Sequence, residues 1–264
     1  MSDKKLEGAG LRGQVAGKTS LSTVGKAGKG LTYRGYPIEV LSEKAKFEEV
    51  AYLLMYGSLP NKDEYENYSS KLISMRSLPN SILEVLERIP ASAHPMDVMR
   101  TGCSMLGNIE PEGEFSNQQE SADRILATMA SIIVYWYKYS HEGKKVNTSS
   151  DYETIGGHFL SLLHGDEPSE DHIRCLDTSL ILYAEHGFNA STFTARTCAS
   201  TLSDIHSCIT GAIGTLRGPL HGGANEAAME LIEQFSTTEE AKSTVLKMLD
   251  NKEKIMGFGH AVYS

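Results

Sequence analysis

The chain has 264 residues, 40% of them hydrophobic and 22% charged, and its 34 acidic residues outnumber its 25 basic ones for a net charge of −9. This composition is that of a globular protein with a sizeable core, in one or two domains. The negative charge argues against a general affinity for nucleic acid, and no apolar run is long enough to span a membrane.

The N-terminal region predicts an irregular arm. Residues 8–37 are rich in Gly, Thr and Ser and contain short β-leaning pieces such as Leu31-Thr32-Tyr33, so one or two small strands are expected there. The first residues, Met-Ser-Asp-Lys-Lys, lead into glycine and polar residues rather than an apolar signal stretch. We therefore expect a cytoplasmic protein.

From residue 42 onward the pattern is helical. Ser42 is predicted to cap a helix that Gly57 ends, and Asn61 with Glu64 predicts a capping box for the next helix. Further helices are predicted over residues 80–89, 95–107, 119–141, 153–164, 169–186, 191–213, 224–235 and 238–250. Strands do not alternate with helices, so the fold class is all-α and a nucleotide-binding α/β sheet is excluded.

The helix over 119–141 is strongly apolar over residues 123–137, a pattern compatible with deep burial against either the core or a partner subunit. The four cysteines, Cys103, Cys175, Cys198 and Cys208, lie far apart in the sequence and are expected to be reduced. The sequence has no His-Glu-x-x-His pattern and no zinc-like Cys/His cluster, so we expect no metal site.

His221 has the most informative setting of the nine histidines. It lies in Arg-Gly-Pro-Leu-His-Gly-Gly-Ala-Asn-Glu, residues 217–226, where a Pro turn leads into the histidine and two glycines open a helix. Glycines allow a ligand to approach the backbone, and a helix start favours negative charge. This setting suits a histidine acting on a carbonyl that becomes an enolate, and we favour it over a histidine that only caps a turn.

Two further histidines have unusual neighbours. His260 lies in Gly-Phe-Gly-His-Ala-Val-Tyr, a glycine-rich loop that becomes informative only beside His221. His186 follows Tyr183 by three residues, so the two are expected to share a helix face near its C-terminal end. From the residues alone, the pair Tyr183 and His186 fits a structural role and a binding role equally well.

Three segments, taken together and in order, resemble the citrate synthase family. They are residues 182–192, residues 218–225 and residues 257–263, with a 39-residue step from His221 to His260. The resemblance covers nearly the whole chain. Residues 13–36, 94–100 and 155–159 resemble the 2-methylcitrate synthase branch in particular.

The resemblance implies an acyltransferase that joins the α-carbon of an acyl-coenzyme A, with propionyl preferred, to the ketone of oxaloacetate through an enol. His221 would bind the thioester oxygen and His260 the ketone, both as catalytic residues, while His186 and Tyr183 would bind substrate. The coenzyme A-binding residues would be Lys254, Ile255, Met256, Gly257 and Phe258. Coenzyme A is then a substrate, and no cofactor is expected. Preorganised donors suit the weakly acidic α-proton of a thioester.

The resemblance also implies a large helical domain over residues 1–220, part of which lies beyond this chain, a smaller domain of which residues 221–264 are the first part, and a homodimer. In this family an Asp base and oxaloacetate-binding arginines follow the second catalytic histidine, whereas this chain stops at Ser264. We therefore expect a piece of a longer protein that has no condensation activity on its own.

Two alternatives remain open from the sequence. Citrate synthase, which uses acetyl-coenzyme A, differs from the favoured branch by one methylene of substrate, worth only about 1–3 kcal/mol of discrimination. A helical binding or scaffold module without catalytic activity would keep the fold but bind neither oxaloacetate nor coenzyme A.

Overall fold

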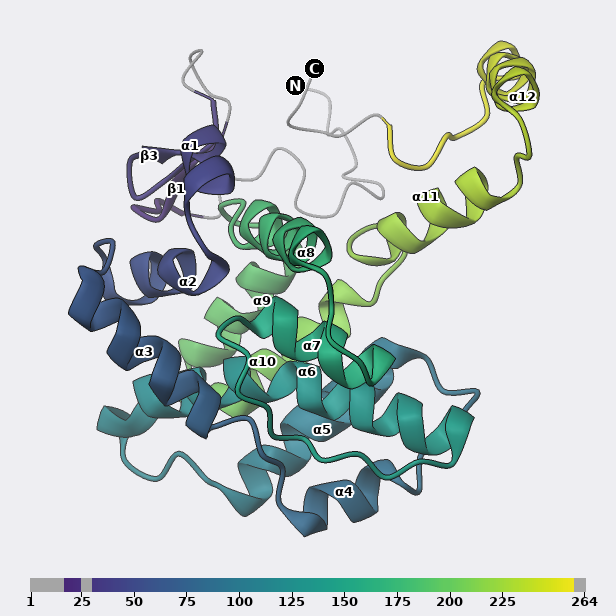
Figure 1. Cartoon of the computed structure of the whole chain (residues 1–264). Helices are drawn as coiled ribbons and strands as arrows, with labels where there is room; N and C mark the ends of the chain where they lie inside the picture. Colours follow the sequence, from purple (N-terminus) through teal and green to yellow (C-terminus); the bar gives the residue numbers. More distant parts are fainter. Residues whose placement is uncertain (1–16, 25–29, 259–264) are drawn as a thin grey trace.

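The computed structural model describes residues 17–24 and 30–258 (Figure 1). Over these residues the chain is a set of α-helices joined by turns, with one small sheet near the N-terminus, which confirms the predicted all-α class. None of the described helices has the length and apolarity needed to cross a membrane. The α-helices are α1 (Ile38–Lys44), α2 (Phe47–Tyr56), α3 (Lys62–Ser74), α4 (Asn80–Leu86), α5 (Pro95–Ile109), α6 (Gln118–Glu142), α7 (Ile155–His164), α8 (Glu170–Tyr183), α9 (Ala190–Ala199), α10 (Ile205–Leu216), α11 (Gly223–Glu233) and α12 (Thr238–Asp250).

Local capping chemistry sets several helix starts where the sequence predicts them. The Asn61 Oδ1 accepts from the Glu64 N–H at 3.0 Å, and the Glu64 carboxylate accepts from the Asn61 N–H at 2.8 Å, so the predicted capping box is confirmed. Pro95 occupies the first position of α5, and Thr237 Oγ1 accepts the Glu240 N–H at the start of α12. The Asn61 and Thr237 caps satisfy amide groups that a helix start leaves unpaired, and Pro95 has no N–H that would need a partner.

The core is organised around α6, which contributes to two buried clusters. One cluster packs α6 against α1, α2, α3, α7 and α8, and the other packs it against α4, α5 and α10. Ile132, Tyr135 and Trp136 of α6 are almost fully buried, so its apolar face is directed into the core. A Cβ on Gly102 of α5 would lie 2.5 Å from Ile132 Cγ2, and the glycine therefore permits the close approach of α5 to α6.

The prediction of one helix from Ser42 to Gly57 is wrong. Ala45 and Lys46 are extended and separate α1 from α2, and the Lys46 N–H donates to the Glu49 carboxylate at 2.8 Å to start α2. Ser42 lies inside α1, where its hydroxyl donates to the Glu39 carbonyl. The break lets α1 and α2 bury separate apolar faces in the same cluster.

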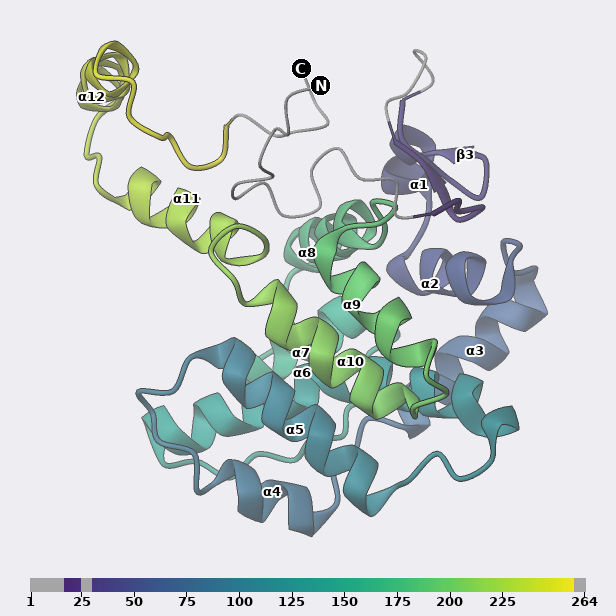
Figure 2. The ribbon, with the colours of Figure 1, turned by 180° about the vertical axis from the view of Figure 1, so that it is seen from behind.

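The predicted single helix over 191–213 is also two helices. α9 ends at Ala199, the chain reverses, and α10 begins at Ile205 and runs beside α9 (Figure 2). Leu202 adopts a left-handed conformation with φ 63°, and Asp204 then caps α10 by accepting the Ser207 N–H at 2.9 Å. Side-chain capping and one unusual backbone angle therefore override a continuous helical periodicity.

The N-terminal arm forms three strands rather than one or two. β1 (Ser22–Thr23), β2 (Thr32–Tyr33) and β3 (Tyr36–Pro37) pair antiparallel in the order β1-β2-β3, with Ser22 opposite Tyr33. Tyr33 is fully buried in the core cluster beside α8. The sheet therefore anchors the arm to the helical body.

α11 and α12 extend away from the helical body (Figure 1), and none of their residues is fully buried. The predicted boundary between residues 1–220 and 221–264 remains a prediction. All four cysteines are free thiols; Cys103 and Cys208 are buried, whereas Cys175 is exposed.

Candidate active site

His221 lies in the tight turn that joins α10 to α11. Its N–H donates to the Gly218 carbonyl at 2.9 Å, and a Cβ on the next residue, Gly222, would lie 2.6 Å from the Leu216 carbonyl oxygen. Glycine at 222 therefore allows the chain to fold back on the end of α10. The turn holds the His221 ring, half-buried, at the start of α11.

The ring of His221 is held by the start of another helix. Ser191 is the second residue of α9, and its N–H donates to His221 Nε2 at 3.3 Å. The Ser191 hydroxyl has one proton to donate and lies near two acceptors, 2.9 Å from the same nitrogen and 2.8 Å from Oδ1 of Asn189, the N-cap of α9. An N–H donated to Nε2 needs a lone pair there, so the proton of the neutral ring lies on Nδ1.

The electrostatics favour the same protonation state. Burial lowers the pKa of His221 below its ordinary value. The positive end of α9, which points at Nε2, opposes a positive charge on the ring in the same sense. His221 is therefore a neutral imidazole that presents Nδ1–H as a hydrogen-bond donor.

Tyr183 and His186 do not share a helix face, so that prediction is wrong. α8 ends at Tyr183, and His186 lies half-buried in the turn between α8 and α9. The Tyr183 side chain is 71% exposed, and its hydroxyl accepts from Asn225 Nδ2 at 3.1 Å. The end of α8 therefore contacts the first turn of α11, four residues beyond His221.

The segment predicted to bind coenzyme A follows α12. Ile255 is buried, whereas Lys254 and Phe258 are exposed, Phe258 at 79%. A Cβ on Gly257 would lie 3.5 Å from the Ala228 Cβ, so the segment runs beside α11. His260 lies outside the described residues.

Several contacts of this site were missed by reasoning from the sequence. Ser191 and Asn225 belong to the segments that carry the resemblance, but nothing in the sequence indicated that they would contact His221 and Tyr183. His94 Nε2 lies 3.1 Å from the Glu226 carboxylate and ties the start of α5 to α11. The sequence predicted a helix start at residue 95, but nothing in it indicated that His94 would contact Glu226.

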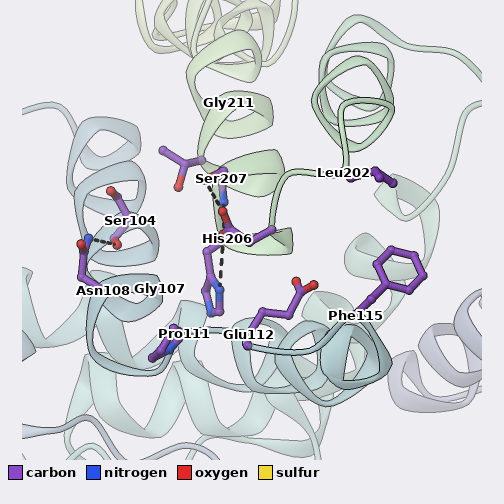
Figure 3. Close-up of a pocket in the computed structure, with 13 residues that line it drawn as sticks. Ser104, Gly107, Asn108, Pro111, Glu112, Phe115, Leu202, His206, Ser207 and Gly211 are labelled. Atoms are coloured by element: carbon purple, nitrogen blue, oxygen red, sulfur yellow. Dashed lines mark hydrogen bonds and ion pairs between the residues drawn. The ribbon is translucent and has the colours of Figure 1, made fainter.

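A surface groove of about 980 Å³ lies at the other end of α10 from His221 (Figure 3). His206 lines it, 3% exposed and packed against Gly107 of α5, and burial lowers its pKa. The acidic residues of the groove cap α10, because Glu112 accepts the Ile205 N–H and Asp204 the Ser207 N–H. These contacts are structural, and no described group of three His, Cys, Asp or Glu side chains could hold a metal ion.

Known proteins resemble this chain over nearly its whole length. The family model described as "Citrate synthase, C-terminal domain" matches residues 10–264. The chain is 64% identical over 264 residues to "2-methylcitrate synthase" of Shewanella oneidensis, covering all of this chain and 70% of that protein. It is 38% identical to "Citrate synthase" of Deinococcus radiodurans, over 96% of this chain and 68% of that protein.

Solved structures show the same similarity. Citrate synthase from Thermotoga maritima matches with a TM-score of 0.83 and 37% identity, over 97% of this chain and 68% of that one. A ternary complex of carboxymethyl coenzyme A and oxaloacetate with citrate synthase from Thermoplasma acidophilum matches with a TM-score of 0.87 and 26% identity, over 96% and 68%. The chain thus spans about two thirds of the length of the proteins it resembles.

Proposed function

This chain belongs to the citrate synthase family, and on that premise we propose that the whole protein condenses an acyl-coenzyme A with oxaloacetate and water to give a citrate-type product and coenzyme A. We propose propionyl-coenzyme A as the preferred thioester and 2-methylcitrate as the product. The relative from Shewanella oneidensis supports this branch, since it is named a 2-methylcitrate synthase at 64% identity.

The observation that carries the proposal is the contact between His221 and the start of α9. With Nε2 accepting from the Ser191 N–H, the neutral ring offers Nδ1–H to an oxygen. When a base removes an α-proton of the thioester, negative charge develops on the thioester oxygen. A donor already fixed in place lowers the energy of that enol or enolate without reorganisation at the moment of reaction.

The remaining steps follow from the resemblance and are proposed on that basis. The enol carbon attacks the ketone carbon of oxaloacetate, and His260 gives a proton to the oxygen that forms. Water then hydrolyses the thioester and releases coenzyme A. The carboxylate base and the arginines for oxaloacetate would come from the part of the protein downstream of residue 264.

The substrate-binding roles are proposed for residues in the turn before α9 and in the segments that contact α11. The Thermoplasma acidophilum citrate synthase, which holds oxaloacetate and a coenzyme A analogue in one ternary complex, supports these two substrates. His186, in the turn before α9, and Tyr183, against Asn225, would face oxaloacetate. Residues 254–258, beside α11, would line the path of coenzyme A.

The central test is a substitution of His221 in the complete protein. His221→Ala should lower kcat by two orders of magnitude or more, as for other lost transition-state donors, with release of free coenzyme A thiol as the readout. His164→Ala, an exposed histidine at the end of α7, is the matched control and should leave kcat unchanged. Full activity of His221→Ala would contradict the proposed mechanism. If the complete protein binds neither oxaloacetate nor coenzyme A, a non-catalytic helical module becomes the better description.

The choice of thioester needs a separate measurement. The specificity constants for propionyl- and acetyl-coenzyme A should favour propionyl by about 10- to 200-fold if the pocket is shaped for one more methylene. A preference for acetyl would place the protein with the citrate synthases. We also propose a cytoplasmic homodimer, which light scattering of the complete protein would test by its mass.

A further inference from the structure

The arm sheet contacts the turn that carries His186. Ser22 of β1 and Tyr33 of β2 are paired opposite each other, and both reach the segment 181–187 at the end of α8. Tyr33 has 0% of its surface accessible to solvent, and Ser22 is 9% exposed. Two neighbouring residues of one small sheet thus contact a turn that lies 148 positions or more later in the chain.

The Tyr33 hydroxyl closes the end of α8. It donates to the Ile181 carbonyl at 2.9 Å, with the Leu182 carbonyl at 3.3 Å, and accepts the Glu185 N–H at 3.3 Å. The last carbonyls of a helix have no partner within it. One phenol from the arm therefore binds both the last turn of α8 and the first residues of the turn that follows.

Glu185 forms a second connection between the sheet and the turn. Its side chain is almost buried, and its Oε1 accepts from the Ser22 hydroxyl at 3.1 Å and from the Gly187 N–H at 2.6 Å. Gly187 has φ 72°, and a Cβ there would lie 3.7 Å from Val24 Cγ2 of the arm. His186 lies between Glu185, which bonds to Ser22 and Tyr33 of the sheet, and Gly187, whose N–H donates to the Glu185 carboxylate.

The residues on both sides of this turn contact the candidate active site. At one end Tyr183 bonds to Asn225, and at the other Ser191 bonds to His221. A displacement of about 1 Å in such a segment is enough to cost an enzyme much of its rate. The placement of the turn therefore decides how the residues on it face His221.

We propose that Tyr33, Ser22 and Glu185 are positioning residues for the keto-acid site, which fix His186 and its turn relative to His221. This inference rests on the proposed function, in which His186 binds oxaloacetate. None of the three touches the substrate. They act by holding the backbone from Ile181 to Gly187 in one conformation.

Steady-state kinetics of the complete protein tests the proposal. Tyr33→Phe removes only the hydroxyl and should raise the KM for oxaloacetate about tenfold, while the KM for the acyl-coenzyme A changes less than about twofold. Tyr68→Phe is the matched control, because Tyr68 is also a buried phenol, bonded to Asp123 of α6 away from the turn. It should lower thermal stability similarly and leave both KM values unchanged.

Glu185 provides a rescue experiment. Glu185→Ala should raise the oxaloacetate KM as Tyr33→Phe does, whereas Glu185→Gln keeps an oxygen for Ser22 and Gly187 and should remain within about threefold of the wild type. Equal effects of the Gln and Ala variants, or equal rises of both KM values in Tyr33→Phe, would overturn the proposal.

Hydrogen exchange separates this proposal from the proposed function. The amides of residues 184–189 should exchange faster in Tyr33→Phe than in the wild type or in Tyr68→Phe. Unchanged exchange there would overturn the positioning role whatever the kinetics show. A wild-type protein that does not consume oxaloacetate would overturn the proposed function instead, and with it the assignment of the turn to a keto-acid site.

Discussion

Ser191 donates its backbone N–H to Nε2 of His221 across 3.3 Å, so a helix start, rather than a carboxylate, holds the imidazole that the enol step would use. A carboxylate partner would raise the pKa of the ring, whereas burial lowers it. The arrangement suits a group that donates a hydrogen bond while remaining neutral.

The Ser191 hydroxyl is the part of this contact that can be removed. Ser191→Ala retains the N–H but loses the hydroxyl, which lies 2.9 Å from Nε2. We expect kcat to fall about three- to tenfold, because a neutral hydrogen bond is worth about 0.5–1.5 kcal/mol. Thr197→Ala, which removes an exposed hydroxyl from the same helix, is the control. A similar loss in both variants would show that the effect belongs to α9 and not to His221.

Glu48 makes stability depend on pH. It is fully buried, with its Oε1 accepting the Ile155 N–H at 2.6 Å, and burial raises its pKa to about 7. The folded chain then holds a proton that the unfolded chain, with a pKa near 4.5, releases. The free energy of unfolding therefore decreases as pH rises from about 4.5 to about 7. Asp177, whose pKa burial raises to about 6, acts in the same direction.

Glu48→Gln should remove part of this dependence. Between pH 5 and pH 8 the wild type should lose on the order of 2 kcal/mol more than the variant, measured as urea midpoints at each pH. Glu66→Gln, an exposed residue of α3, is the control and should follow the wild type. Parallel pH curves for wild type and Glu48→Gln would mean that Glu48 is ionised in the folded protein at pH 5.

Two glycine-to-alanine changes should have opposite signs. Gly102→Ala would force a methyl group against Ile132 in the core and should cost about 1–3 kcal/mol. Gly214→Ala in α10 would meet only the Arg100 side chain, at 3.6 Å or more, and should gain up to about 1 kcal/mol of helix propensity. Thermal unfolding of the two variants measures both effects, and a stabilised Gly102→Ala would contradict the close packing of α5 on α6.

Leu202 is a site where the natural residue should not be the most stable one. It has φ 63° and is 82% exposed, so it bears a left-handed backbone without burying its side chain. Leu202→Gly should therefore stabilise the protein by about 1 kcal/mol. Leu249→Gly, an exposed leucine inside α12, should instead destabilise by about 1 kcal/mol. Destabilisation by both changes would show that Leu202 makes contacts in solution.

Features that depend on neighbouring residues were predictable from the sequence. The capping box at Asn61, Pro95 at a helix start and the apolar stripe of α6 each lie within a few positions, and each is present in the structure. The breaks at Ala45 and Leu202 were missed because apolar spacing continues across them. Asp204 was the available signal for the second break, as an N-cap in the middle of a predicted helix.

The candidate site shows the same division. The glycines and the histidine around residue 221 indicated a turn at a helix start, and the structure has one. The end of α8 was misplaced because Tyr33, 148 positions before Ile181, supplies the hydroxyl that closes it. No local pattern reports such a partner.

The contact between the arm and α8 has a consequence for the order of events during synthesis. Ser22 and Glu185 are separated by 163 positions, so the ribosome releases the arm well before its docking surface exists. At about 5–20 residues per second that interval is roughly 8–30 seconds. Closing so long a loop is entropically unfavourable until helices around α6 have packed. β1 and β2 are therefore among the last of the described elements to reach their final place.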